Sequence, residues 1–145
     1  MESAVKIYEL KKIQSDFPKI KISESRHAYE FIKKFYGDDL EIFESFFILL
    51  LDRGNHTIGY AKISQGGISG TVVDIRLIAK YAIESLCSSI ILAHNHPSGT
   101  LNPSQEDKKI TEKIAEGLKI FDVGVLDHII LTSENYYSFL DSGLL

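Results

Sequence analysis

The chain has 145 residues, of which 44% are hydrophobic and 25% charged, the composition of an ordinary globular protein. Its 10 glycines and 3 prolines are too few for a low-complexity or linker-rich chain. This length suits one domain with a core that needs no disulfide, so we expect residues 1–145 to form a single domain with residues 1–23 as its N-terminal extension.

The net charge of −4 disfavours nucleic acids as partners, because the field of the whole molecule repels phosphates. The single cysteine, Cys87, cannot form an intramolecular disulfide and lies in an apolar helical pattern, where we expect it to be buried. No apolar run approaches the length of a membrane span, and the N-terminus lacks the apolar segment of a signal peptide. We therefore expect a cytoplasmic protein with no membrane contact and weak or no nucleic-acid binding.

The first quarter of the chain contains two short extended patterns and one helical pattern. Alternating apolar residues predict a strand over Val5–Leu10, and a second extended piece is expected over Lys19–Ile22. From Ser25 the apolar residues recur at helical spacing, and Gly37 is expected to close this helix. The residues that set the helical spacing are Ala28, Phe31, Ile32 and Phe35.

The middle of the chain predicts a hairpin and a glycine-rich loop. Two strand patterns, Glu44–Leu51 and Thr57–Ser64, flank turn residues at 52–55. The glycines at 66, 67 and 70 predict a flexible or tightly turned loop. They lack the spacing of a nucleotide-binding fingerprint, which disfavours a phosphate site.

The second half alternates helices and strands. Asp74 is expected to cap a helix that runs to about Cys87, and a helix from Ser104 is expected to end at Gly117 or soon after. The predicted strands are Ser89–His94, Lys119–Val125 and His128–Leu131, and Tyr136–Leu140 is a short closing element. This order predicts an α/β fold, a three-layer α/β/α sandwich around a mixed β-sheet.

The end of the Ser89–His94 strand carries the most informative motif. Because strand side chains alternate, His94 and His96 leave the same face of the chain. Residues 97–99 then break the strand, and Ser104 begins a helix with Asp107 in its first turn. Two imidazole nitrogens and one carboxylate oxygen can hold a zinc ion and leave a fourth position open for water, which is the arrangement of catalytic zinc sites.

A purely structural interpretation stays open for each residue alone. His94 is then a core histidine, His96 a surface residue, and Ser104 and Asp107 form a variant of the capping box. Short motifs give many false matches, so each residue taken separately favours this reading. Their occurrence together at the mouth of a strand favours a metal site.

Four segments of this chain carry a resemblance to a known family: His94-Asn95-His96-Pro97-Ser98-Gly99, Pro103-Ser104-x-x-Asp107, Leu126-Asp127-His128 and Tyr137-Ser138-Phe139. They resemble the RadC family of bacterial JAB/MPN-type (JAMM) metalloprotease-like domains. The resemblance runs from about Glu24 to the C-terminus and implies a JAB/MPN, cytidine-deaminase-like fold. It also implies that His94, His96 and Asp107 are the zinc ligands.

The resemblance further implies two catalytic residues and a reaction. Glu44, eight residues before Asp52, corresponds to the general base that activates a zinc-bound water. Ser104 corresponds to a serine that helps to hold the substrate's carbonyl oxygen, a role compatible with N-capping. The implied function is zinc-dependent hydrolysis of peptide or isopeptide bonds in a peptide or protein substrate.

Two alternatives remain. Full-length RadC proteins carry an N-terminal helix-hairpin-helix-like region, for which the segment before Glu24 is too short; a DNA-repair accessory protein that binds metal without a proteolytic role is the first alternative. A metal-dependent hydrolase of another amide or of nucleotides is the second. Asp127 and His128 point to opposite faces of a strand, so we expect His128 to be a structural hydrogen-bonding residue rather than a joint ligand.

Overall fold

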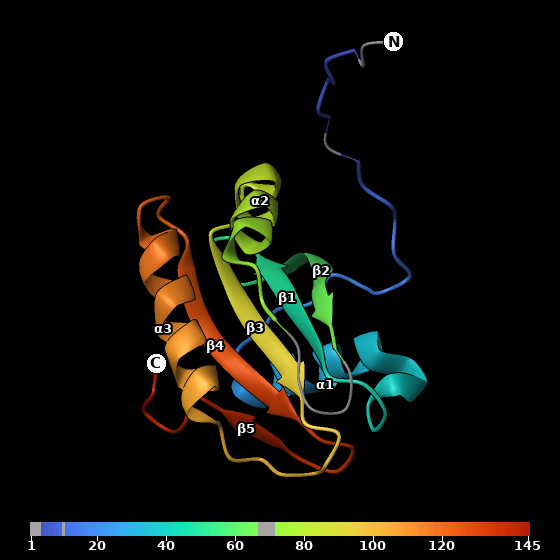
Figure 1. The fold of residues 1–145 in the computed structure, drawn as a ribbon, viewed down its shortest axis with the longest axis vertical. Coiled ribbons are helices and arrows are strands. Elements are labelled where there is room, and N and C mark those ends of the chain that lie inside the picture. Colours follow the sequence, from blue (N-terminus) through green and yellow to red (C-terminus); the bar gives the residue numbers. More distant parts are fainter. Residues whose placement is uncertain (1–3, 10, 67–71) are drawn as a thin grey trace.

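The computed structural model describes residues 4–9, 11–66 and 72–145 (Figure 1). In chain order, its elements are α1 (Ser25–Tyr36), the short 3-10 helix η1 (Gly37–Asp39), β1 (Ser45–Leu51), β2 (Thr57–Gln65), α2 (Ile75–Ser85), β3 (Ser89–Asn95), α3 (Gln105–Lys119), β4 (Gly124–Leu131) and β5 (Tyr136–Ser138). Within these residues, no helix combines the length and apolarity that crossing a bilayer requires.

The five strands form one mixed sheet in the order β2-β1-β3-β4-β5. Strands β3 and β4 are parallel, while every other neighbouring pair is antiparallel. A parallel pair needs a long crossover connection, and α3 supplies it between β3 and β4. Both β1 and β3 are buried along their whole length, which explains why they appear in the sequence as nearly continuous apolar runs.

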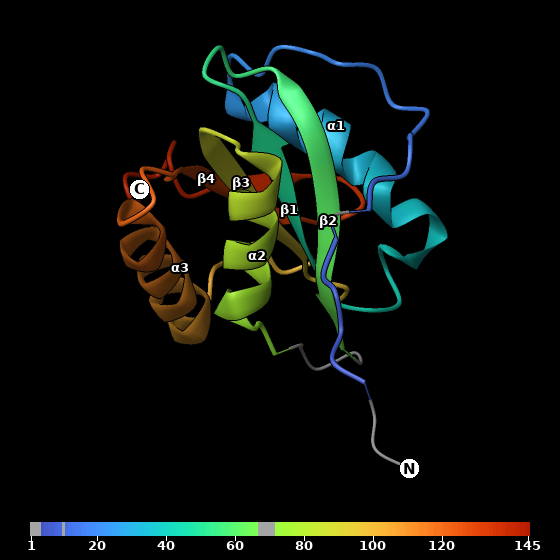
Figure 2. The ribbon, with the colours of Figure 1, turned by 90° about the horizontal axis from the view of Figure 1, so that it is seen from above.

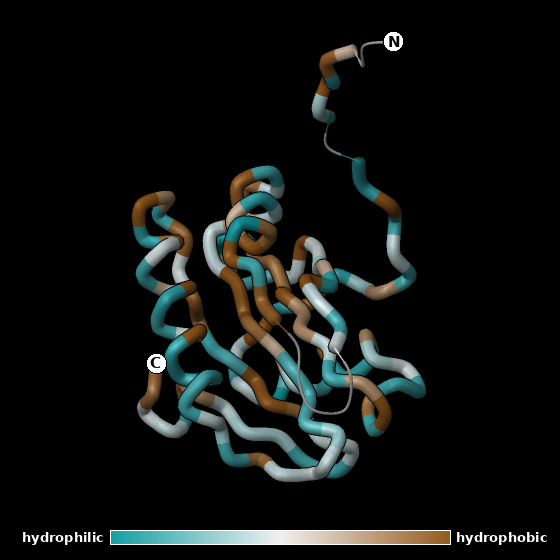
Figure 3. Tube along the Cα trace, viewed as in Figure 1, coloured by the Kyte–Doolittle hydropathy of each residue, from teal (hydrophilic) through white to brown (hydrophobic). Residues whose placement is uncertain are grey.

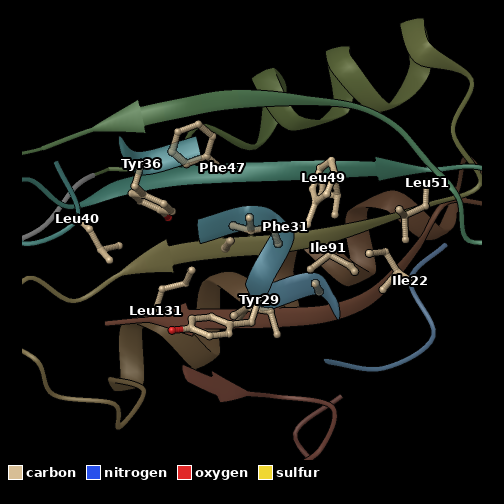
Figure 4. Close-up of a cluster of buried hydrophobic side chains, with 14 residues drawn as sticks. Ile22, Tyr29, Phe31, Tyr36, Leu40, Phe47, Leu49, Leu51, Ile91 and Leu131 are labelled. Atoms are coloured by element: carbon tan, nitrogen blue, oxygen red, sulfur yellow. The ribbon is translucent and has the colours of Figure 1, made fainter. Parts of the chain in front are cut away.

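Helices cover both faces of the sheet, so the predicted three-layer α/β/α sandwich is confirmed (Figure 2). Helix α1 packs on one face, where Phe47, Leu49 and Leu51 of β1 join its buried side chains (Figure 4). The alternate residues of β1 pack on the other face beneath α2 and α3. The most hydrophobic stretches of the chain accordingly run through the central strands (Figure 3).

The predicted hairpin and helix ends are confirmed in detail. The Asp52 carboxylate closes the turn between β1 and β2 by accepting the backbone N–H groups of Gly54 and His56, both at 2.9 Å. Asp74 caps α2, its side chain accepting the N–H of Arg76 at 2.9 Å. Cys87 is buried, as expected.

The predicted strand over Val5–Leu10 is wrong over residues 5–9, which form no strand. Their side chains at Val5, Ile7 and Tyr8 are 87–97% exposed, because apolar alternation produces a strand only when a neighbouring strand is present. Leu10 lies outside the described residues, as do the loop glycines Gly67 and Gly70. The expected extended piece at 19–22 makes a single bridge, between Lys21 and His56.

The predicted division into strands Lys119–Val125 and His128–Leu131 is also wrong. Helix α3 continues through Lys119, and one strand, β4, spans Gly124–Leu131. The apolar residues between them belong to a turn, in which Ile120 is 81% exposed and Asp122 has a left-handed φ of 56°. Gly117 lies inside α3, since one glycine in a helix costs only about 1 kcal/mol and does not end it.

Candidate metal centre

The three predicted metal ligands lie together where β3 ends and α3 begins. The Nε2 atoms of His94 and His96 are 3.0 Å apart. The Asp107 carboxylate lies beside both, with Oδ1 3.3 Å from Nε2 of His94 and Oδ2 3.4 Å from Nε2 of His96. Their side chains are 4%, 14% and 19% exposed, so the cluster is largely sheltered yet open to solvent on the His96 and Asp107 side.

These separations suit a tetrahedral metal. Zinc binds imidazole nitrogen and carboxylate oxygen at about 2.0–2.2 Å, which places neighbouring ligands of a tetrahedron roughly 3.3–3.6 Å apart. The two contacts of the histidines with the Asp107 oxygens, 3.3 Å to Oδ1 and 3.4 Å to Oδ2, lie within this range. The separation of the two histidine nitrogens, 3.0 Å, lies slightly below it. The residues therefore fit a zinc ion with only small adjustments.

The tautomer of His96 is fixed by its second ring nitrogen. Nδ1 lies 2.6 Å from the carbonyl oxygen of Thr100, which can only accept a hydrogen bond. Nδ1 therefore carries the hydrogen, and Nε2 of the neutral ring presents its lone pair to the cluster. His94 is also engaged at Nδ1, which lies 2.7 Å from Nε2 of His128.

The electrostatics of the cluster favour a positive charge at its centre. Burial alone would raise the pKa of the Asp107 carboxyl, but the contacts with His94 and His96 and the N–H of Ser104 outweigh it and hold the pKa far below its usual range. Burial likewise opposes protonation of His96, yet Asp107, the Thr100 carbonyl and Glu44 together raise its pKa. A proton or a metal ion can satisfy these groups, and they compete for the same lone pairs.

Ser104 is the N-cap of α3 and forms a capping box with Asp107, as the structural interpretation anticipated. The Ser104 hydroxyl accepts the N–H of Asp107 at 3.0 Å, and Asp107 Oδ2 accepts the N–H of Ser104 at 2.8 Å. Capping and metal binding are compatible here, because the box holds the carboxylate where it faces the two histidines. The cap uses a lone pair of the hydroxyl and leaves its hydrogen for another acceptor.

Glu44 also reaches the cluster, although it lies far from it in sequence. A carboxylate oxygen of Glu44 and one nitrogen each of His94 and His96 all lie within 4.8 Å of one another. The antiparallel pairing of β1 with β3 produces this approach, since Phe46 lies opposite His94 in the register. Glu44 directly precedes β1 and is half-buried at this end of the sheet.

Asn95 is a site residue that sequence reasoning missed. Its side chain is fully buried on the opposite face of β3 from the histidines. The amide oxygen accepts the N–H of Ser45 at 2.8 Å, and the amide nitrogen donates to the carbonyls of Leu40 and Phe43, both at 2.7 Å. Asn95 thereby ties down the chain on both sides of Glu44. The available signal was strand alternation, which turns Asn95 inward, where a buried amide needs partners.

His128 and Asp127 point to opposite faces of β4, as predicted. Asp127 accepts hydrogen bonds from the Ser138 hydroxyl at 2.6 Å and the Leu140 N–H at 3.0 Å, which fastens the C-terminal segment. His128 is fully buried beneath His94 and is hydrogen-bonded to it, the kind of contact expected of a structural hydrogen-bonding residue. Burial is the main cause that lowers the pKa of His128 well below its usual value.

Comparison with known families agrees with this geometry. A family model described as RadC-like JAB domain matches residues 22–144, nearly the whole of the folded part. This chain belongs to the RadC-like JAB domain family. The match begins close to Glu24, where the sequence resemblance was expected to start.

Relatives of this RadC-like JAB domain carry the name UPF0758 protein. The one from Flavobacterium johnsoniae is 46% identical over 124 residues, which cover 86% of this chain and 53% of the relative. The Porphyromonas gingivalis protein is 40% identical over 125 residues, 86% of this chain and 54% of the relative. UPF0758 protein YfjY of Escherichia coli is 41% identical over 102 residues, 70% and 64% of the two chains. This chain thus spans about half the length of the first two relatives.

Proposed function

We propose that this RadC-like JAB domain is a zinc-dependent hydrolase of peptide or isopeptide bonds. One observation carries the proposal: the Nε2 atoms of His94 and His96 lie 3.0 Å apart, and each lies 3.3–3.4 Å from an oxygen of the Asp107 carboxylate. Such a set of two imidazoles and one carboxylate is typical of catalytic zinc sites, which keep one position for water or substrate.

His94, His96 and Asp107 would hold the ion. Zinc suits this set better than magnesium or calcium do, because those harder ions prefer oxygen ligands throughout. When bound, a zinc ion supplies a Lewis acid that lowers the pKa of water and polarises a carbonyl group.

Glu44 acts as the general base. Its carboxylate takes a proton from the attacking water as the water oxygen bonds to the carbonyl carbon of the substrate. When the carbon–nitrogen bond then breaks, Glu44 returns the proton to the leaving amine. Its half-buried position within 4.8 Å of the histidine nitrogens supports this role, since the base must lie close to the reacting water.

Ser104 assists at the carbonyl oxygen. Because the cap of α3 occupies only a lone pair of its hydroxyl, the hydroxyl hydrogen can be donated to the oxygen as negative charge develops there. The N-terminal end of α3 adds the positive end of the helix dipole to the same region.

Metal content tests the proposal. Protein purified without chelator and supplied with zinc should hold about one ion per chain, and His96→Ala should lower that content because one of three ligands is lost. His27→Ala is the control, since His27 lies on α1, across the sheet from the cluster. A folded parent protein that stays free of metal would remove the proposal. Loss of peptide or isopeptide hydrolysis on chelation, and its return with zinc, is the result expected for the catalytic part of the proposal.

A further inference from the structure

Three buried side chains connect the backbone of α3 to the ring of His94. Thr111 Oγ1 lies 2.6 Å from the carbonyl oxygen of Asp107 and 2.6 Å from Nδ1 of His128. Nε2 of His128 lies 2.7 Å from Nδ1 of His94. Thr111, His128 and His94 are at most 3% exposed, so these groups themselves must supply the hydrogen for each contact.

The Thr111 hydroxyl determines which group donates in each hydrogen bond of this series. It has one hydrogen, and the Asp107 carbonyl can only accept, so that hydrogen belongs to the carbonyl contact. The contact between Thr111 and His128 then needs a hydrogen from the imidazole. Nδ1 of His128 is therefore the donor.

The tautomer of His128 decides that of His94. Full burial favours the neutral imidazole, in which one nitrogen donates and the other accepts. With its hydrogen on Nδ1, His128 accepts at Nε2, and Nδ1 of His94 must carry the hydrogen between the two rings. Nε2 of His94 is left with a lone pair, aimed at His96 and Asp107.

We propose that Thr111 and His128 are positioning residues whose hydrogen bonds hold His94 in the tautomer able to bind a metal. This inference rests on the proposed metal site and extends it to two residues that touch no metal. The series of hydrogen bonds starts at the backbone of Asp107 and ends at the ring of His94. It therefore joins one proposed ligand to another across α3, β4 and β3.

Packing fixes the His128 ring in the required orientation. Phe139 stacks on it with ring centroids 4.6 Å apart and an angle of 17° between the planes. Phe46 meets it edge-on at 5.6 Å and 70°. With aromatic rings on two sides, His128 cannot rotate freely to exchange its two nitrogens.

The first test uses the unaltered protein and depends on no variant. Nitrogen-15 NMR of the imidazole rings distinguishes the two tautomers, and we expect hydrogen on Nδ1 in both His94 and His128. A hydrogen on Nε2 of neutral His128 would reverse the donors and acceptors in this series of hydrogen bonds and overturn the inference. This result is independent of zinc, so it separates failure of the inference from failure of the metal site.

The second test removes the first link. Thr111→Val keeps the shape but leaves Nδ1–H of His128 without its acceptor, so His128 should shift its hydrogen to Nε2 and drive that of His94 towards the metal side. Zinc affinity, measured by competition with a coloured chelator, should fall about 10–100-fold, the usual effect of losing an outer hydrogen bond to a ligand.

Two matched variants isolate the hydroxyl. Thr111→Ser restores it and should bind zinc as the parent does, with the parent NMR pattern. Thr57→Val removes another buried threonine hydroxyl, at the opposite end of the sheet, and should leave zinc affinity unchanged. A folded Thr111→Val protein with parental zinc affinity and an unchanged His94 ring would contradict the inference.

Discussion

The two faces of the end of β3 carry polar side chains that are used in opposite ways. On one face, Nε2 of His94 and Nε2 of His96 point at each other and at the Asp107 carboxylate, all of them groups that bind a cation. On the other face, Asn95 has its amide oxygen and amide nitrogen bonded to backbone groups of the segment before β1.

The difference separates a structural use of buried polarity from a functional one. A buried amide with every contact made stabilises one backbone arrangement, here that of the segment around Glu44. A cluster of hydrogen-bond acceptors that face one another is stable only with a positive charge between them. This is the property of a metal site. Glu44 is connected to both uses of buried polarity. Asn95 holds its backbone neighbours in place, while its carboxylate lies near the two histidines.

The largest expected effect comes from Glu44→Gln, which alters the cluster around His94 and His96 and leaves the contacts of Asn95 intact. The amide keeps the shape but cannot accept the proton, so hydrolysis should fall by ~10²–10⁴ while zinc stays bound. Steady-state rates and metal content measure the two parts. Glu41→Gln, at an exposed position of the same segment, is the control and should retain the parent rate. Parental hydrolysis by the Glu44 variant would exclude this base.

Ser104→Ala should have the next largest effect. Loss of a donor to the substrate's carbonyl oxygen typically lowers the rate by ~10²–10³. Loss of the cap should also lower the free energy of unfolding by about 1 kcal/mol. Ser104→Thr keeps the hydroxyl and should preserve most of both. If Ser104→Ala changes only stability in denaturant titrations and leaves the rate intact, the serine is a cap and nothing more.

Asn95→Ala tests the structural side of the comparison. It leaves the Ser45 N–H and the carbonyls of Leu40 and Phe43 without their partner, and one unsatisfied buried group costs about 1–3 kcal/mol. Urea unfolding should show a loss of at least this size, and hydrolysis should fall further than zinc affinity because the Glu44 segment loosens. Asn102→Ala, at an exposed asparagine, should change little. An Asn95 variant as stable as the parent would refute the structural role.

The smallest effect is expected with DNA. The net charge of −4 predicts no tight binding of duplex or branched DNA near physiological salt, and any weak binding should decline steeply with added salt. Fluorescence anisotropy at several salt concentrations measures this. Submicromolar affinity at physiological salt would favour the DNA-repair accessory role over the hydrolase.

The sequence predicted the sheet's central strands and the helices because their signals are local. Buried runs identify β1 and β3, and apolar spacing identifies α1. The two wrong strands, at Val5–Leu10 and within Lys119–Val125, have apolar residues but no partner strand over the described positions. Whether such residues pair is decided by the rest of the fold.

Within the site, the histidines and Asp107 could be foreseen because they occupy one motif. Glu44 came from family resemblance, since only the register of β1 on β3 brings it close. The part played by His128 depends on the parallel register that sets it opposite Leu92, two residues before His94. Thr111 follows Asp107 by one helical turn, and this spacing is visible in the sequence. Its contact with His128 on β4 could not be read from the sequence.

The order in which the site can assemble during folding follows from where its parts lie along the chain. The proposed ligands occupy one short stretch, 94–107, whose ends meet through a small loop closure. Glu44 joins them only when the β1–β3 pairing forms, across a separation such as the 50 positions between Ser45 and Asn95. In a partly unfolded chain in which β1 has left β3, the proposed ligands are still close together in sequence, but Glu44 is no longer held beside them. If both proposals hold, we expect metal capture to precede catalytic competence during folding.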